Sequence, residues 1–345
     1  MVILEKNKND TSSIIDLLRA LAAQAVCVGH AIMFFRSDLM PSSLPLMQNV
    51  GVLVFFVLSG FLIAYTLQRK AADPDYGFFR YALERFARIY SGLVPSLAFV
   101  MLCDAIIGQR DSFLSLLANL LMNEGYRGIF PNALPREPFG SAHQLWTLAI
   151  EWHIYLSVGA AFFLFLRRGR MAILVLILLF YGQTSSHYLW GAYQADGVGR
   201  GLFSLWLGGA ATYLLISRLH IGREAALLLA LAAFSILLVQ THRGEEYSFL
   251  VYALLLVAFV GLVSWSQRTN GISKVASERI RFFADYSLTL YLTHHSLMVL
   301  MKAFQPEAGA MGLVVAVIAS NLAAICLAEI GEKQHRRILA ILLAR

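Results

Sequence analysis

The sequence predicts an all-α fold, a polytopic membrane bundle of about ten transmembrane helices with both termini in the cytoplasm. Of its 345 residues, 58% are hydrophobic and only 14% are charged, and the mean hydropathy is +0.65. Soluble domains carry about 25% charged residues, so most of this chain is not expected to meet water. Ten apolar runs approach the roughly 20 residues that cross a bilayer as a helix, and the basic residues gather between alternate runs.

The ten runs follow one another along the chain, without a polar stretch long enough to form a second, soluble domain. We therefore predict a single transmembrane domain over residues 1–345. Its spans are expected at 13–35, 46–68, 89–109, 143–166, 171–190, 199–217, 223–241, 247–266, 282–302 and 308–330. The connection 110–142 is the least regular, because its apolar stretch SFLSLLANLLM is a candidate for entering the membrane interface.

Basic residues orient this array. With a cytoplasmic N-terminus, the inside segments hold twenty Lys and Arg, the outside segments hold six, and two lie within spans. This bias follows the positive-inside rule. The net charge of +7 is therefore distributed as a topology signal and not as a nucleic-acid-binding face. The three cysteines are spaced for neither a zinc site nor a disulfide framework, and no metal is expected.

Ionisable side chains within membrane spans are costly and by default mark a functional site. Ten such residues lie inside the predicted spans, at the edge of one or just before one: Asp16, Arg19, His30, Arg85, Arg88, Glu151, His153, Arg200, His294 and His295. Arg19 and His30 are eleven residues apart, about three helical turns, so they share one helix face. Asp16, one turn before Arg19, is placed to hold its guanidinium.

Depth divides these residues into two layers. Counting ~1.5 Å per residue from the cytoplasmic ends puts Arg19 roughly 9 Å into the membrane. Arg85 and Arg88 are expected at the inner surface. The same count gives about 25 Å for His30, about 23 Å for Glu151 and about 18 Å for His294. A cationic layer is thus expected near the cytoplasm, with a His/Glu/His layer in the outer half.

The two layers suit two kinds of chemistry. Guanidinium groups bind phosphate through paired hydrogen bonds, and a histidine beside a carboxylate suits proton transfer. A long phosphorylated donor such as a coenzyme A thioester could bridge the layers. Each residue alone also has a structural explanation, as an interhelical hydrogen bond or a loop charge. We interpret His153 and His295 in that structural way.

Five motifs in order resemble those of the acyltransferase-3 family of ten-span membrane acyltransferases. They are IIDLLRA with its Arg and His at Asp16, Arg19 and His30; FFVLSGF at 55–61; ERFARIY with Arg85 and Arg88; LWTLAIEWHIYL with Trp146 and Glu151; and YSLTLYLTHH with Tyr291 and His294. The resemblance covers most of the chain. The proline that usually follows the paired arginines is Ser91 here, and the one after the last histidine is Ser296.

The resemblance implies an enzyme, an acyltransferase for groups other than amino-acyl groups. Such enzymes transfer acyl groups, most often acetyl from acetyl-CoA, to sugars of surface polysaccharides, lipopolysaccharide or lipids. By the same resemblance His30 is the catalytic histidine, and Arg19, Arg85 and Arg88 bind the acyl-CoA. We thus expect O-acylation of a carbohydrate or glycolipid hydroxyl in the bacterial inner membrane, surrounded by lipid.

In the mechanism we expect, His30 removes the proton of the acceptor hydroxyl, and Glu151 or a neighbouring group orients its imidazole. A covalent acyl-histidine intermediate is the alternative. His294 and Tyr291 would stabilise the oxyanion or hold the acceptor. The rival function is a proton-coupled transporter of a sugar or lipid, which uses the same intramembrane residue types. No inverted repeat or pair of interrupted helices favours it. The sequence indicates neither the acceptor nor the oligomeric state.

Overall fold

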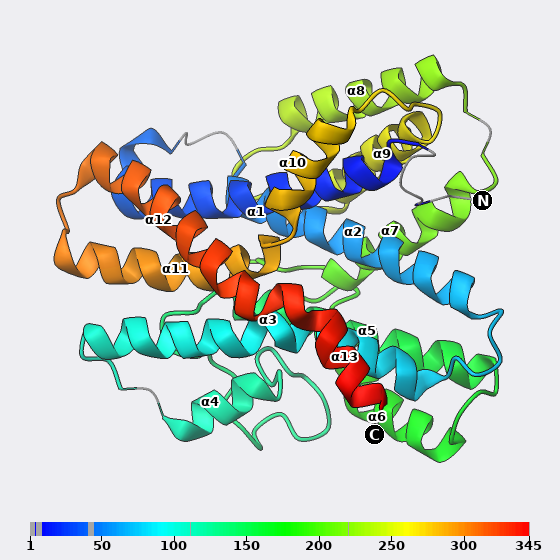
Figure 1. Ribbon diagram of the computed structural model, residues 1–345, viewed down its shortest axis with the longest axis horizontal. Coiled ribbons are helices and arrows are strands. Elements are labelled where there is room, and N and C mark those ends of the chain that lie inside the picture. The colour runs from blue at the N-terminus through cyan, green and yellow to red at the C-terminus, as the bar shows by residue number, and fades with distance from the viewer. Residues whose placement is uncertain (1–3, 5–8, 41–44, 111, 220, 345) are drawn as a thin grey trace. The chain divides into compact units, whose positions relative to one another are not determined.

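The computed structural model describes residue 4 and residues 9–40, 45–110, 112–219 and 221–344. Every regular element among these residues is a helix (Figure 1), which confirms the predicted all-α fold. The chain divides into two compact units. The first comprises residues 1–26, 41–72 and 188–284, and the second comprises residues 27–40, 73–187 and 285–345.

The first unit is built on two pairs of closely packed helices. It contains the start of α1 (Thr11–Phe35), α2 (Met47–Lys70), α7 (Leu202–Ile216), α8 (Arg223–Gln240), α9 (Phe249–Ser266) and α10 (Lys274–Ala284). Helix α2 packs against α7, and α8 packs against α9. A Cβ at Gly60 of α2 would lie 2.0 Å from the Trp206 carbonyl oxygen, so only glycine allows this approach. Ser59 accepts a hydrogen bond of 2.9 Å from Trp206 Nε1, which gives the FFVLSGF motif a packing role.

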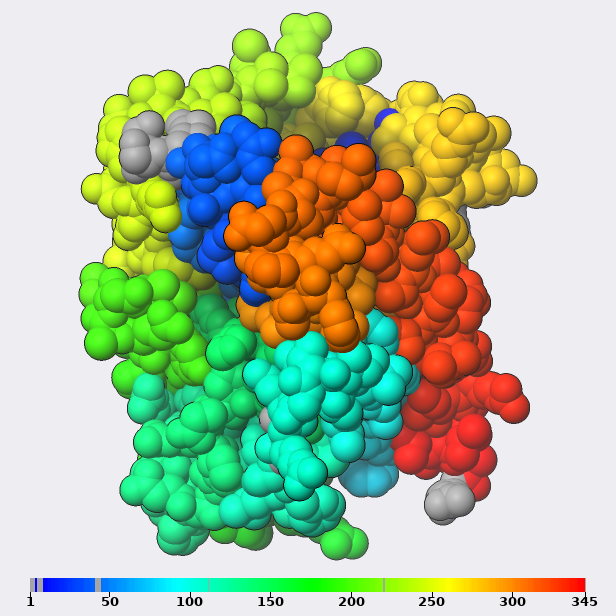
Figure 2. All heavy atoms as spheres, turned by 90° about the vertical axis from the view of Figure 1, so that its left-hand side faces the viewer, coloured from blue at the N-terminus to red at the C-terminus, as the bar shows by residue number. Residues whose placement is uncertain are grey.

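The second unit is centred on α3. It contains the end of α1, η1 (Ser37–Leu39), α3 (Phe78–Ile106), α4 (Phe113–Leu120), α5 (Leu145–Phe165), α6 (Met171–His187), α11 (Ser287–Phe304), α12 (Gly309–Ile330), η2 (Glu332–Gln334) and α13 (His335–Leu343). Helix α3 contacts α5, α11, α12 and α13, while α5 pairs with α6 and α11 with α12. Figure 2 shows a face of this unit on which α11 and its connection to α12 (orange) adjoin the α3–α4 segment (cyan).

Each of the ten predicted spans contains a helix. Among the described residues, seven helical segments are long and apolar enough to cross a membrane, as expected of a multi-pass membrane protein. Helices α6 and α7 are apolar but shorter, at 17 and 15 residues. Helix α11 has 18 residues and carries His294, His295 and Lys302. The remaining helices, α4, α10 and α13, were not among the predicted spans.

Two helices begin several residues away from the predicted starts of their spans. Helix α3 begins at Phe78, whereas its span was predicted from residue 89. The preceding turns hold Glu84, Arg85 and Arg88, which lower the hydropathy, yet Glu84 is buried and accepts a 2.8 Å hydrogen bond from Tyr76 Oη. Helix α11 begins at Ser287, whereas its span was predicted from residue 282.

The connection that follows α3 contains α4, which folds back beside α3. Ser112 caps α4, its hydroxyl accepting from the backbone N–H of Ser115. At the far end of α4, Tyr90 Oη of α3 donates a 2.6 Å hydrogen bond to the Leu120 carbonyl. Tyr90 precedes the last residue of α3, Ile106, by sixteen positions, about 24 Å along the helix. Helix α4 therefore lies beside the middle of α3 and not beyond its end.

Candidate functional site

Two helices of the second unit bring histidine side chains into contact. His30 Nδ1, near the end of α1, lies 2.9 Å from His294 Nε2 on α11. The ring of His295 stands edge-on to that of His30, with 5.4 Å between centroids. His294 is fully buried, and His30 is half-buried. The pairing of His30 with His294 brings together two residues that the sequence placed in one layer.

The hydrogen bonds of this pair fix which nitrogens carry protons. His294 Nδ1 lies 2.9 Å from the Leu290 carbonyl oxygen, which can only accept. His294 therefore carries its proton on Nδ1 when neutral, and its Nε2 is an acceptor. His30 must then donate through Nδ1, which leaves the lone pair of His30 on Nε2. This arrangement is that of a histidine oriented by one partner and able to take a proton on its other nitrogen.

His295 belongs to a separate chain of hydrogen bonds. Its Nδ1 donates over 2.7 Å to the carbonyl of Ser141, and the Ser141 N–H donates over 3.0 Å to Asp104 Oδ2. Asp104 and His295 are both buried. The ring of His143 also meets that of His295 edge-on. These contacts hold the turn before α5 against α11, in keeping with the structural interpretation of His295.

Tyr291, one turn before His294, has its hydroxyl proton engaged. Its Oη lies 2.5 Å from Thr147 Oγ1 and 3.1 Å from the Gln144 carbonyl, to which Thr147 is also hydrogen-bonded at 3.1 Å. The hydroxyls of Tyr291 and Thr147 have one proton each. One of these protons is donated to the Gln144 carbonyl oxygen and the other to the oxygen of the neighbouring hydroxyl. Tyr291 in this geometry fixes the start of α5, and its predicted role toward the oxyanion or the acceptor stays a prediction.

Two carboxylates lie near Tyr291. Glu151 of α5 accepts a 2.5 Å hydrogen bond from Tyr155 Oη. Glu151 and the buried Glu124, from the connection after α4, are both close enough to act electrostatically on Tyr291. The prediction was that Glu151 or a neighbouring group orients the His30 imidazole. His294, which accepts the hydrogen bond from His30 Nδ1, is one such neighbouring group.

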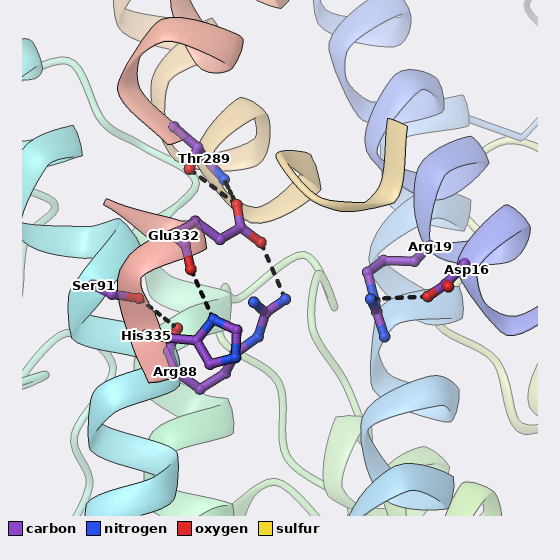
Figure 3. A network of polar contacts seen from close by, with 7 residues as sticks. All are labelled: Asp16, Arg19, Arg88, Ser91, Thr289, Glu332 and His335. Atoms are coloured by element: carbon purple, nitrogen blue, oxygen red, sulfur yellow. Dashed lines mark hydrogen bonds and ion pairs between the residues drawn. The ribbon is translucent and has the colours of Figure 1, made fainter. Parts of the chain in front are cut away.

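The paired arginines lie within the first half of α3, and their predicted place at the inner surface of the membrane stays a prediction. Arg88 Nη2 donates over 3.1 Å to Glu332 Oε1. Glu332 Oε2 accepts from both the backbone N–H and the hydroxyl of Thr289, at 2.9 and 3.0 Å (Figure 3). His294 is five residues further along α11, about 7.5 Å. Glu332 therefore links Arg88 to the first turn of the helix that carries His294.

Arg85 and His335 lie in the same part of the second unit. The Arg85 guanidinium lies over the Tyr81 ring, 6.0 Å from its centroid. His335 Nδ1 donates over 2.9 Å to the Glu332 carbonyl, and the guanidinium groups of Arg85, Arg88 and Arg336 act on its ring electrostatically. This cluster of cationic side chains suits a phosphorylated ligand.

Arg19 belongs to the first unit. Its Nη1 lies 3.3 Å from Asp16 Oδ1, one turn earlier in α1, which is the contact expected from their spacing (Figure 3). About a quarter of each side chain is exposed, at 24% and 23%. Asp16 orients the guanidinium of Arg19, while the predicted donor-binding role of Arg19 stays a prediction.

Several residues around the site were not among the predicted ones. Glu332 and His335 lie in the polar segment after the last predicted span, where their neighbours Lys333, Arg336 and Arg337 indicated only a topology signal. Glu124 lies in the irregular connection, where no periodicity marks it. Within the described residues, no three or more His, Cys, Asp or Glu side chains are arranged to hold a metal ion.

Comparison with known proteins identifies the family. A family model described as an acyltransferase domain matches residues 13–329, nearly the whole chain. No match was found among curated proteins or solved structures. The matched range contains all seven predicted site residues and the His30–His294 pair. The chain therefore belongs to the acyltransferase-3 family and is a membrane acyltransferase.

Proposed function

We propose that this enzyme moves an acetyl group from cytoplasmic acetyl-CoA to a hydroxyl of a surface polysaccharide, lipopolysaccharide or lipid-linked sugar in the bacterial inner membrane. The observation that carries the proposal is the hydrogen bond of 2.9 Å between His30 Nδ1 and His294 Nε2. Because His294 Nδ1 is bonded to a carbonyl, His30 keeps a lone pair on Nε2. Acyl transfer to a hydroxyl needs a base of this kind.

The proposed step uses His30 as base and then as acid. As the acceptor oxygen bonds to the acyl carbon of the thioester, its proton passes to His30 Nε2. The carbon–sulfur bond then breaks, and His30 returns the proton to the sulfur of the departing coenzyme A. While His30 is positively charged, its Nδ1–H bond to His294 Nε2 becomes charge-assisted and stronger. His294 is thus a positioning residue in this account.

The donor is proposed to bind through its phosphates at Arg85 and Arg88. Arg88 engages Glu332 with one of its terminal nitrogens, and about a third of its side chain, 31%, is exposed. Guanidinium groups have five N–H donors, so the remaining ones are available for a phosphate. Glu332 of η2 joins Arg88 to Thr289 at the start of α11, and His294 lies on the same helix, so a long donor lying along α11 would reach both groups.

The proposed function is tested with purified protein in detergent or nanodiscs. Acetyl-CoA binding is measured by calorimetry, and release of free coenzyme A is followed after adding membranes that contain the acceptor glycans. The glycans of a deletion strain and its parent are compared by mass spectrometry. Binding, acceptor-dependent thiol release and a missing O-acetyl group in the deletion strain are expected. Absence of acetyl-CoA binding and of any acylation difference would rule out the proposed donor and acceptor.

A further inference from the structure

Glu332 is a fully buried acidic residue directly after α12. It lies in η2, where its neighbours in sequence include Lys333 and, about one turn further on, Arg336 and Arg337. Its exposed fraction is 0%. A buried carboxylate is costly unless it is paired and hydrogen-bonded, so its contacts indicate what it is there to hold.

Both carboxylate oxygens of Glu332 have partners. Oε1 accepts from Arg88 Nη2 at 3.1 Å, and Oε2 accepts two hydrogen bonds from Thr289. Thr289 lies in the first turn of α11, where backbone N–H groups lack a partner within the helix. Glu332 therefore joins the arginine of α3 to the start of the helix that carries His294 (Figure 3).

The backbone around Glu332 is held in place independently of its side chain. A Cβ on Gly331 would lie 2.6 Å from the Ser91 carbonyl oxygen and 2.9 Å from Pro95 Cγ. That contact places the segment against α3 one turn beyond Arg88. On the other side, His335 Nδ1 donates to the Glu332 carbonyl. The carboxylate thus projects from a fixed backbone, whereas the guanidinium that it holds is partly exposed.

We propose that Glu332 is a positioning residue for the acyl donor. It fixes the Arg88 guanidinium in the orientation that binds a donor phosphate, and it ties that guanidinium to the first turn of α11. The inference rests on the proposed donor role of Arg88. Glu332 lies beyond residues 13–329 that the family model matches, so it extends the site into the last segment of the chain.

The test substitutions are Glu332→Gln and, as a matched control, Glu329→Gln. Glutamine at 332 keeps an oxygen for the two Thr289 donors but turns an amide N–H₂ toward Arg88, so only the arginine contact is lost. Glu329 is one turn earlier and 59% exposed, and it pairs with Lys333 at the surface. Both variants lose one negative charge from the same segment.

The expected result is an acetyl-CoA dissociation constant raised about tenfold in Glu332→Gln, with the transfer rate at saturating donor nearly unchanged. Glu329→Gln should bind like the original protein. In an Arg88→Gln background, Glu332→Gln should weaken binding no further, because the two residues act as one unit. Glu332→Asp keeps the negative charge and should bind acetyl-CoA more tightly than Glu332→Gln does. It is the variant to measure if Glu332→Gln is not monodisperse.

Two outcomes separate this inference from the proposed function. If Arg88→Gln weakens binding but Glu332→Gln does not, or if the two effects add fully, Glu332 does not act through Arg88 and the inference fails alone. If Arg88→Gln binds acetyl-CoA with unchanged affinity, the proposed donor site itself is wrong, and the inference fails with it.

Discussion

At the scale of single residues, His30 and His294 have different tasks although both are intramembrane histidines. The bond from His294 Nδ1 to the Leu290 carbonyl makes His294 an acceptor toward His30. The sequence placed both residues in one layer from helix depth alone. It could not predict their pairing, because that depends on how α1 and α11 pack.

A prediction for His294 follows from the geometry of its two nitrogens. The amide of glutamine reaches about as far as Nε2 of histidine, whereas the amide of asparagine corresponds to Nδ1. His294→Gln should therefore keep an acceptor for His30 Nδ1 and retain measurable acyl transfer. The transfer rate of His294→Asn should be at least about tenfold lower than that of His294→Gln. Rates of coenzyme A release at saturating donor and acceptor measure the difference. Equal rates in the two variants would contradict the positioning role.

The two arginines of α3 are equivalent in the sequence motif but not in the structure. Arg88 is bonded to Glu332, and Arg85 lies over Tyr81. Arg85→Ala and Arg88→Ala should each weaken acetyl-CoA binding, by about tenfold for a charged hydrogen bond. Lysine at either position should restore only part of the acetyl-CoA affinity, because its ammonium group cannot donate two parallel hydrogen bonds as the planar guanidinium does. Unchanged affinity in both alanine variants, with normal folding, would reduce the pair to a topology signal.

At the scale of elements, the sequence predicted which segments are helical better than where they begin. Hydropathy gave ranges that each contain a helix, since apolar content determines which segments enter the membrane. The predicted span began at residue 89 whereas the helix begins at Phe78, because Glu84, Arg85 and Arg88 resemble loop charges until their partners are known. Arg88 is joined to the helix that carries His294 through Glu332 and Thr289, a link that hydropathy does not reveal.

Helix α4 gives a prediction about the connection 110–142. Tyr90 holds its far end beside the middle of α3, and its outer face carries Phe113 and Leu117, which are 78% and 36% exposed. If α3 spans the bilayer, this face meets lipid. In a protein without its native cysteines, Cys at Leu117 should resist a membrane-impermeant maleimide but react with a lipid-soluble one.

A control cysteine at Asn132 in the same connection separates depth from poor reactivity. Asn132 is exposed and lies outside any helix, so it should react with both reagents from the outer side. Equal labelling of the 117 and 132 cysteines by the impermeant reagent would show that α4 stays in water.

At the scale of the whole molecule, composition and the distribution of charge were sufficient to predict the all-α membrane fold, and five sequence motifs were sufficient to predict the family. They did not reveal the polar residues that surround the predicted site residues. Glu332, His335 and Glu124 are polar residues in connections, and only their burial and contacts distinguish them from solvated loop residues. The long-range contact between η2 and α3 has no local sequence signal.

The predicted topology follows from the twenty-to-six distribution of basic residues. Reporter fusions after residues 70 and 345 should report the cytoplasm, and a fusion after residue 195 should report the periplasm. Paired reporters that are active on opposite sides of the membrane check each position. A cytoplasmic signal at 195 would overturn the order of the spans.

The most direct test of the account is His30→Asn, measured for both donor binding and acyl transfer in the purified, well-folded enzyme. The asparagine amide can still donate to His294 Nε2, so a purely structural histidine would be replaced with little loss. It cannot take a proton, and a general base contributes about 10²–10⁴-fold. We expect acetyl-CoA affinity near that of the original protein and transfer reduced by at least about 10²-fold. Substantial transfer by His30→Asn would contradict the catalytic role of His30.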